Sequence, residues 1–320
     1  MCVFGATSEL VAADDSALNS AEQLIRCGKY AVAEALLRDT SQDLAKSEHK
    51  NPSTLARTLN DLGLLAAYRG NYLEAADYYR RSLSTLEATY GNDGAESAQT
   101  LNNLASVYLA VGRIAESERM RRHALEIYTR SLGPDDPKVA AVLNGLAIVA
   151  VRRNQNTEAV ALLRRALAIF QVNQTSDTVE AASIDNSLGV VALADGDCQG
   201  SRLHFQSTLV IYEKAWGPDN PQLIKPLANL GVADVFCGCP LEGVTELTKA
   251  LNLAERVLGS EHPEVAQVLS NYAMALRRLK RKSDAKRMEK RAREILAQSS
   301  GDALGRYTVD IGDLARSGAQ

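Results

Sequence analysis

Apolar and small residues follow the spacing of two amphipathic helices, and this pair of patterns returns every 42 residues along the chain. The first pattern carries an apolar residue followed by a small one, as at Leu62-Gly63, and the second opens with a small residue such as Ala75. Small residues at both places let paired helices approach closely. Because the units align without gaps from about residue 16 to residue 300, we predict a solenoid of stacked helix pairs. The units start near residues 16, 58, 100, 142, 184, 226 and 268.

A turn residue separates the two helices of every unit. Glycine fills this position in five units, asparagine in one and lysine in the last. A left-handed backbone is easiest for glycine or asparagine, so Asn154 fits such a turn and Lys280 does not. The turn positions are Gly28, Gly70, Gly112, Asn154, Gly196, Gly238 and Lys280.

Stop and start signals follow the same period. Glycines suited to end the second helix are Gly91, Gly133, Gly217, Gly259 and Gly301, and Thr175 takes that place in the fourth unit. Capping residues precede proline at Asp136-Pro137, Asn220-Pro221 and His262-Pro263, of which His262 is the weakest cap. The predicted fold class is therefore all-α, a right-handed α–α superhelix of about seven helix-turn-helix units.

The repeat divides the chain into three parts. The solenoid spans residues 16–300, between an N-terminal leader or arm over residues 1–15 and a C-terminal tail over residues 301–320. The leader has no basic segment and Glu9 interrupts its apolar stretch, so it does not match a signal peptide, while Val11-Ala12-Ala13 resembles a cleavage site. In the tail, Val309, Ile311 and Leu314 form a strip that either docks on the last unit or stays loose.

The repeated unit resembles the tetratricopeptide repeat, or TPR. Gly63, Tyr72, Ala75, Tyr79 and Ser82 match one copy of that motif, and Ala105, Tyr108, Ala124 and Leu125 match another. The usual repeat has 34 residues. The 42-residue unit and its segment LGPDDPKVAAVLNGLA resemble the long variant of kinesin light chains and many bacterial scaffold proteins. The resemblance implies protein binding, in a concave groove where asparagines on the first helices hydrogen-bond the backbone of an extended peptide.

The candidate site is a polar row on the first helices, in which asparagines share one repeat position and asparagine, aspartate or serine the next. A carboxamide donates and accepts, so it can hold a peptide main chain whatever the side chains are. Alternatively, part of the row is a structural ladder within the solenoid, because adjacent helical positions cannot all face one way. The predicted peptide-binding groove comprises Asn60, Tyr68, Asn102, Asn103, Asn144, Arg152, Asn186, Asn229 and Asn271.

Two features of the inner face indicate which class of ligand the groove is expected to bind. Tyr68 either contacts the ligand or packs between units. In the family that the chain resembles, clustered lysines and arginines on these helices grip an acidic C-terminus, whereas Arg57, Arg152 and Lys225 are dispersed along this chain. We therefore expect an apolar or mixed peptide rather than a carboxylate clamp of that kind.

Charge and cysteine content bear on partners and compartment. The net charge is −3, which gives no overall basic footprint for nucleic acid. The five cysteines are odd in number and irregularly spaced, so we expect reduced thiols, a cytoplasmic location and no metal site. An exported protein is the alternative if the leader is the remnant of a signal peptide.

A basic segment lies near the C-terminal end of the solenoid. Between Arg277 and Glu294 there are ten basic and three acidic residues. The segment is either a solvated capping helix, which we favour, or a surface for an acidic protein, RNA or an anionic membrane.

No nucleotide-binding, zinc-protease or hydrolase motif is present in the sequence. The sequence therefore predicts a non-enzymatic scaffold or adaptor without a cofactor, which binds a protein or peptide segment in its groove. The alternative function is a regulatory or sensor module that binds a small ligand or a polyanion through the groove or the basic helix.

Overall fold

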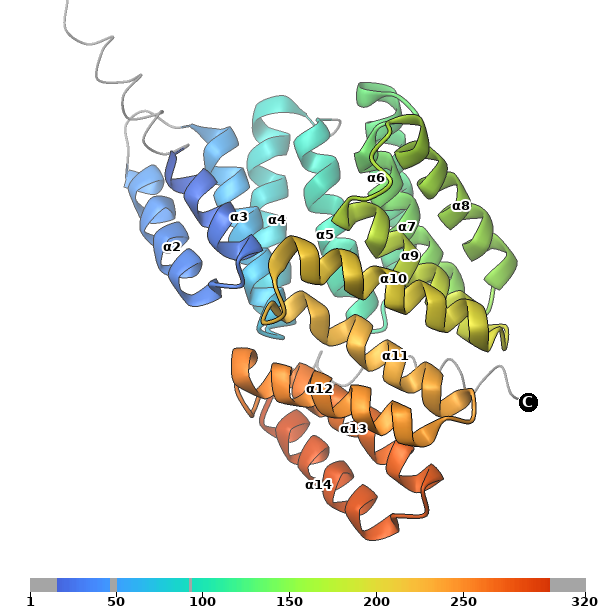
Figure 1. Ribbon diagram of the computed structural model, residues 1–320. Coiled ribbons are helices and arrows are strands. Elements are labelled where there is room, and N and C mark those ends of the chain that lie inside the picture. The colour runs from blue at the N-terminus through green and yellow to red at the C-terminus, as the bar shows by residue number, and fades with distance from the viewer. Residues whose placement is uncertain (1–15, 47–50, 92–93, 300–320) are drawn as a thin grey trace, which may run out of the picture.

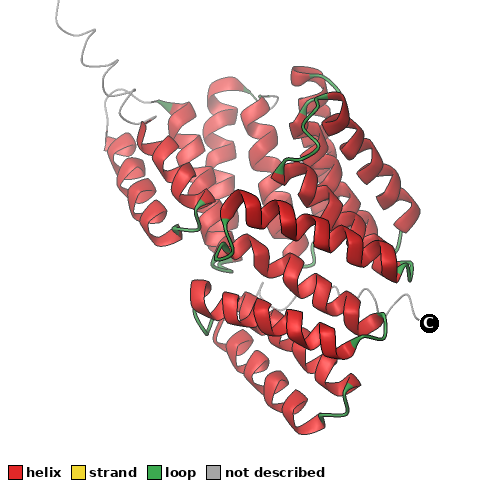
Figure 2. Cartoon of the chain, in the orientation of Figure 1, coloured by secondary structure: helices red, strands yellow, loops and turns green. Residues whose placement is uncertain are grey.

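The computed structural model describes residues 16–46, 51–91 and 94–299, and these residues form seven stacked helix pairs with no strand among them (Figures 1 and 2). The predicted all-α superhelix of about seven units is confirmed. The leader, the tail and Gly301 lie outside the described residues. The pairs are residues 16–26 with α2 (Tyr30–Lys46), α3 (Pro52–Tyr68) with α4 (Tyr72–Tyr90), α5 (Ala95–Ala110) with α6 (Ile114–Leu132), α7 (Pro137–Arg152) with α8 (Asn156–Val172), α9 (Val179–Ala194) with α10 (Cys198–Trp216), η1 (Pro221–Leu223) and α11 (Ile224–Phe236) with α12 (Pro240–Leu258), and α13 (Pro263–Arg278) with α14 (Lys282–Ser299).

The second and fifth units are held together where a large buried side chain crosses a glycine of the first helix. A Cβ atom added to Gly63 would lie 2.8 Å from the ring of Tyr79, and one added to Gly189 would lie 2.7 Å from the ring of Phe205. These rings therefore fill the space that a larger residue would need. The close approach predicted from the small residues is confirmed at both crossings.

The seven turn positions all adopt positive φ angles, including Asn154 at 58° and Lys280 at 60°. The expectation that Lys280 would not fit was wrong. Its backbone N–H donates to the carbonyl of Arg277, as that of Gly70 donates to Ala67, so the hydrogen bonding of the turn outweighs the strain on lysine.

The helix ends lie at the predicted signal residues, except that the left-handed residue after α8 comes one position earlier. The side chains of Asp136, Asn220 and His262 each accept a hydrogen bond from the backbone N–H two residues later, so all three act as N-caps. In the fourth unit α8 ends at Val172, and the left-handed residue is Gln174 rather than Thr175, because this helix has 17 residues whereas α4, α6, α10 and α12 each have 19.

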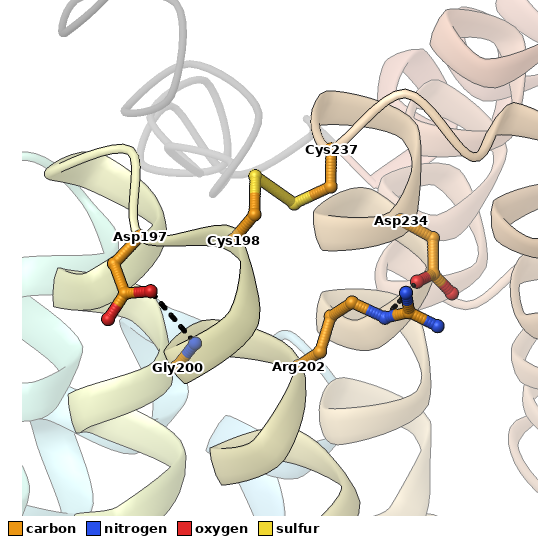
Figure 3. The surroundings of a disulfide bond; sticks show 6 residues. All are labelled: Asp197, Cys198, Gly200, Arg202, Asp234 and Cys237. Carbon is orange, nitrogen blue, oxygen red and sulfur yellow. Dashed lines mark hydrogen bonds and ion pairs between the residues drawn. A yellow bond between two sulfur atoms is a disulfide. The ribbon is translucent and has the colours of Figure 1, made fainter.

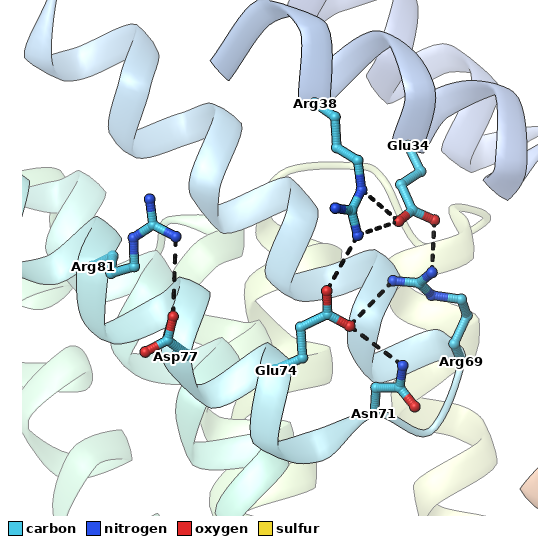
Figure 4. A network of polar contacts seen from close by, with 7 residues as sticks. All are labelled: Glu34, Arg38, Arg69, Asn71, Glu74, Asp77 and Arg81. Atoms are coloured by element: carbon cyan, nitrogen blue, oxygen red, sulfur yellow. Dashed lines mark hydrogen bonds and ion pairs between the residues drawn. The ribbon is translucent and has the colours of Figure 1, made fainter. Parts of the chain in front are cut away.

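A polar network fixes the register between neighbouring units at the turn end (Figure 4). Arg69, beside the turn of the second unit, reaches Glu34 of α2 at 2.8 Å, and Arg38 bridges Glu34 to Glu74 of α4. Two units further on, the equivalent residues Glu118, Arg122, Arg153 and Glu158 make the same set of ion pairs. Exposed ion pairs of this kind contribute little stability, so we assign the network to alignment of the units.

The superhelix closes on itself after one turn. Asn220 Nδ2 donates to the carbonyl of Arg26 at 3.0 Å, and His262 Nε2 donates to the carbonyl of Tyr68 at 2.6 Å. Both contacts join residues 194 apart, which is between four and five repeats, and the second is the first moved along by one repeat. The first two units therefore pack against the loops that precede α11 and α13 (Figure 1).

Glycine is required at the turns where this closing contact forms. A Cβ atom at Gly28 would lie 2.8 Å from Pro221, and one at Gly70 would lie 2.7 Å from Pro263. Gln222 adds a hydrogen bond to the hydroxyl of Tyr68 at 3.0 Å. We call these contacts between the first two units and the loops before α11 and α13 the inter-turn contact.

A disulfide joins Cys198 to Cys237, with the Cα atoms 5.5 Å apart (Figure 3). The expectation of reduced thiols was wrong for this pair, and the argument from thiols to a cytoplasmic location no longer applies. The two residues are 39 apart, close to one repeat, and stacking places residues about one repeat apart side by side. Cys198 begins α10 and Cys237 follows α11, while Cys27 and Cys239 are free.

Removing this disulfide is expected to lower the free energy of unfolding by about 2–4 kcal/mol, because the cross-link restricts the unfolded chain. The measurement is denaturant unfolding of the Cys198→Ala/Cys237→Ala variant. The matched control is Cys27→Ala/Cys239→Ala, which leaves the disulfide intact. Equal stabilities of the two double variants would contradict a stabilising role for the disulfide.

Candidate functional site

The concave face contains a half-open cavity of about 950 Å³. Its walls come mainly from the first helices of successive units, and second helices supply the floor. Gln222 of the inter-turn contact also lines it, so the contact closes one end of the groove. The predicted site residues that line this cavity are Asn60, Tyr68, Asn102 and Asn144.

The remaining predicted residues divide between a second cavity and the helix interfaces. A smaller cavity of about 290 Å³ lies on the other side of the inter-turn contact and is lined by Tyr68, Arg152, Asn229 and Asn271. Asn103 and Asn186 line neither cavity. The structure therefore does not bring the predicted residues into one site, because the closing of the superhelix divides the groove.

The asparagine row contains members of both kinds that the sequence left open, namely asparagines that bond neighbouring units and asparagines that line the cavity. Asn103 Nδ2 donates to Asn60 Oδ1 at 3.0 Å, and Asn229 Nδ2 donates to Asn186 Oδ1 at 3.3 Å, so these four residues link neighbouring units. Asn144 donates to Ser183 Oγ at 3.3 Å, but its own Oδ1 is buried without a partner. Asn144 thus lines the cavity and carries a buried acceptor that has no partner among the described residues.

Asp61 is a buried carboxyl group in the wall of the large cavity. It is 8% exposed, accepts a hydrogen bond from Asn60 at 3.2 Å, and has no partner for Oδ2. Burial, assisted by the charge of Glu22, raises the pKa of Asp61 to about 7. Most other units carry asparagine or serine at this position, and so keep the site polar without a charge.

This pKa predicts a pH-dependent stability. Between about pH 4 and pH 7 the folded protein keeps the Asp61 proton that the unfolded chain loses, so stability falls as the pH rises through this window. Asp61→Asn is expected to remove this pH-dependent loss of stability and so to raise the free energy of unfolding at pH 8 by about 1–3 kcal/mol. Denaturant unfolding of both proteins at pH 5 and pH 8 checks this. The prediction would be contradicted if the wild type and the variant differed in free energy of unfolding by the same amount at both pH values.

Arg121 is the residue of this site that the sequence analysis missed. It lies on α6, in the floor of the cavity, and is 4% exposed. Nη1 donates to Asn102 Oδ1 at 2.6 Å and Nη2 to Ser106 Oγ at 2.9 Å, while Nε has no partner. Burial lowers the pKa of this guanidinium to about 10. The sequence pointed to Arg121, since five of the six other units have a large apolar residue at this repeat position.

The basic segment forms the end of α13 and most of α14. Ala285, Ala292 and Ile295 bury one face of α14. Half of the basic side chains pair with carboxylates, including Arg291 with Glu255 on α12. The other pairs are Arg277–Glu289, Arg281–Asp284, Arg287–Asp284 and Lys290–Glu294. This geometry fits a helix that covers the end of the stack.

Two further properties concern the described residues only. None of their helices is long and apolar enough to cross a membrane. They also contain no group of three or more histidine, cysteine, aspartate or glutamate residues arranged to hold a metal ion.

Comparison with solved structures places the fold among known superhelices. A Rap conjugation gene regulator of plasmid pLS20, in complex with the Phr* peptide, aligns with a TM-score of 0.60 and 13% identity over 92% of this chain and 98% of that one. A Rap protein complexed with competence and sporulation factor gives 0.55 and 16% over 91% and 99%. BtubC (BKLC) from P. vanneervenii gives 0.51 and 20% over 77% and 93%.

Family models match most of the solenoid, whereas comparison with curated proteins finds no significant match. One tetratricopeptide repeat model matches residues 54–120, 96–171 and 229–298, and a second matches residues 145–215. These matches span the units whose helix pairs and turns are described above. The chain belongs to the tetratricopeptide repeat family.

Proposed function

We propose that the protein is a non-enzymatic scaffold that binds an extended segment of a partner protein in the large cavity. The observation that carries this proposal is a half-open, mixed-polarity cavity of about 950 Å³, whose wall contains hydrogen-bonding groups without a partner among the described residues. Its volume is at the upper end of the range of about 300–1,000 Å³ that is usual for ligand pockets. It is therefore large enough for a short peptide segment.

The family and the fold support this choice of ligand. Helical repeat proteins use their concave surface for binding. The two Rap structures were solved with a peptide and with competence and sporulation factor, and they share the superhelical architecture of this chain. In the present chain, Asn144 lines the cavity, and its unpaired Oδ1 would accept a hydrogen bond from the peptide main chain once the side chain turns toward it.

A peptide-binding experiment with matched asparagine variants tests the proposal. Random heptapeptides are displayed on phage and selected on the purified chain, and the affinity of each selected peptide is measured by fluorescence anisotropy. Asn144→Ala is expected to weaken binding up to about tenfold, because one hydrogen bond contributes about 0.5–1.5 kcal/mol.

The control is Asn156→Ala on α8, since Asn156 bonds Asp195 and lines neither cavity. It should leave the affinity unchanged. Selection of no peptide, or equal losses for Asn144→Ala and Asn156→Ala, would argue against binding in this cavity.

A further inference from the structure

Arg121 occupies a position that is apolar in five other units. The equivalent residues are Leu37, Tyr79, Leu163, Phe205 and Leu247, and all are at most 1% exposed. In those units the side chain fills the core between the paired helices. In the third unit the same position carries a charge into the core and places it at the floor of the large cavity.

Among the described residues, the guanidinium has no counterion within ion-pair distance. Its two hydrogen bonds go to the neutral oxygens of Asn102 and Ser106. No carboxylate of the described residues lies within 4.0 Å of it, although Arg121 lines a cavity whose wall contains Glu22, Asp61, Glu96 and Glu180. A buried charge without a partner is costly, so arginine at this position calls for a function other than packing.

A second departure from the repeat creates the space for this side chain. Gly145 on α7 stands where other units have Asp61, Asn103, Ser187, Asn229 and Asn271. A Cβ atom at Gly145 would lie 1.7 Å from Arg121 Nη1, so only glycine admits the guanidinium. Glycine is unfavourable within a helix. Two unfavourable residues at non-equivalent positions thus combine to present one arginine to the cavity.

We propose that Arg121 binds one carboxylate of the partner segment, so that the partner carries an acidic side chain or its own C-terminus at this point. This inference rests on the proposed peptide-binding function. A planar carboxylate matches the fork of donors on a guanidinium. It also brings one negative charge to one arginine, in a wall that carries Arg26, Arg57 and Lys138 beside its four acidic residues.

This site differs from a cluster of basic residues on the first helices. Its single cation comes from a second helix, and its hydrogen-bonding neighbours Asn102 and Ser106 hold the guanidinium in place from α5. Nε also has no hydrogen-bond partner within the described part of the chain, but it is buried, so the N–H groups of Nη1 and Nη2 that do not bond Asn102 and Ser106 are the donors left for a carboxylate.

The test uses heptapeptides selected on the wild-type chain, each synthesised in three forms. The first has a free C-terminus, the second is amidated, and the third keeps the free C-terminus with every Asp and Glu replaced by Asn and Gln. The wild type is expected to bind one of the two altered forms at least tenfold more weakly, a difference of about 1.4 kcal/mol. The amidated form reports a C-terminal carboxylate, and the third form an acidic side chain.

Two variants test the site, one by replacing the arginine itself and the other by filling the space that its guanidinium occupies. Arg121→Leu restores the residue of three other units, and Gly145→Ala displaces the guanidinium with a single methyl group. Both are expected to bind the three peptide forms with affinities within about twofold of one another, a difference of about 0.4 kcal/mol. Asn156→Ala, the control, should discriminate like the wild type. Circular dichroism and size-exclusion chromatography establish that each variant is folded.

The outcomes separate this inference from the proposed function. If the wild type selects peptides but does not distinguish the three forms, the carboxylate site is wrong while peptide binding stands. The same conclusion follows if either folded variant still discriminates tenfold. If no heptapeptide binds in any form, both proposals fail.

Discussion

Replacing Arg121 with leucine is expected to raise the free energy of unfolding by about 1–4 kcal/mol. The change removes an almost fully buried charge that has no carboxylate partner in the described part of the chain, and it supplies the apolar side chain found at Leu37, Leu163 and Leu247. The oxygens of Asn102 and Ser106 that lose a donor line the large cavity, where water can replace it. Guanidinium chloride unfolding followed by circular dichroism measures the difference.

The reverse substitution provides the control for this first prediction. Leu163→Arg puts the same charge at the equivalent position of the fourth unit, where Ser187 rather than glycine stands at the facing position of the next unit. It should destabilise the protein by about 3–5 kcal/mol, the usual penalty for an unpaired buried charge. A destabilising Arg121→Leu would show instead that the guanidinium is part of the structural core.

The double substitution Gly28→Ala/Gly70→Ala is expected to break the inter-turn contact and open the superhelix. The new methyl groups would meet Pro221 and Pro263 at less than 3 Å, so the first two units would have to move away from the later ones. Small-angle X-ray scattering should show an increased radius of gyration. A compact chain of this length has a radius of about 20 Å.

A second double variant distinguishes the effect of backbone strain at the turns from the effect of opening the superhelix. Gly196 and Gly238 have positive φ angles of 79° and 83°, close to those of Gly28 and Gly70, but a Cβ atom at either has nothing within 4 Å. The backbone strain in Gly196→Ala/Gly238→Ala should therefore lower the free energy of unfolding by about 2–4 kcal/mol, at about 1–2 kcal/mol per strained residue. The radius of gyration of this variant should remain that of the wild type. Equal radii for both double variants would mean that the inter-turn contact does not set the shape.

Local features of the fold were predictable from the sequence because they depend on residues within one unit. Helix pairs, close crossings such as Gly63 with Tyr79, and N-caps such as Asp136 follow from short-range spacing. Lys280 was misjudged because its intrinsic preference was weighed without the hydrogen bonds of the turn.

Features between units were harder to predict. The Cys198–Cys237 disulfide becomes visible only when the chain is laid out on its 42-residue period, which places the two residues on adjacent units. The inter-turn contact depends on the curvature of the superhelix, which the repeat pattern alone does not specify. For that reason the candidate asparagines were predicted as one groove, while the structure divides them between two cavities and the helix interfaces.

The inter-turn contact also limits how this gene product can change its repeat number. An open solenoid can gain or lose an internal unit, since each unit touches only its neighbours. Here Asn220 and His262 meet partners 194 residues earlier, and deleting one unit between them would shift each partner out of reach. Shortened or duplicated versions of the chain would have to rebuild the closing surface, so its repeat count is set by geometry as well as by stacking.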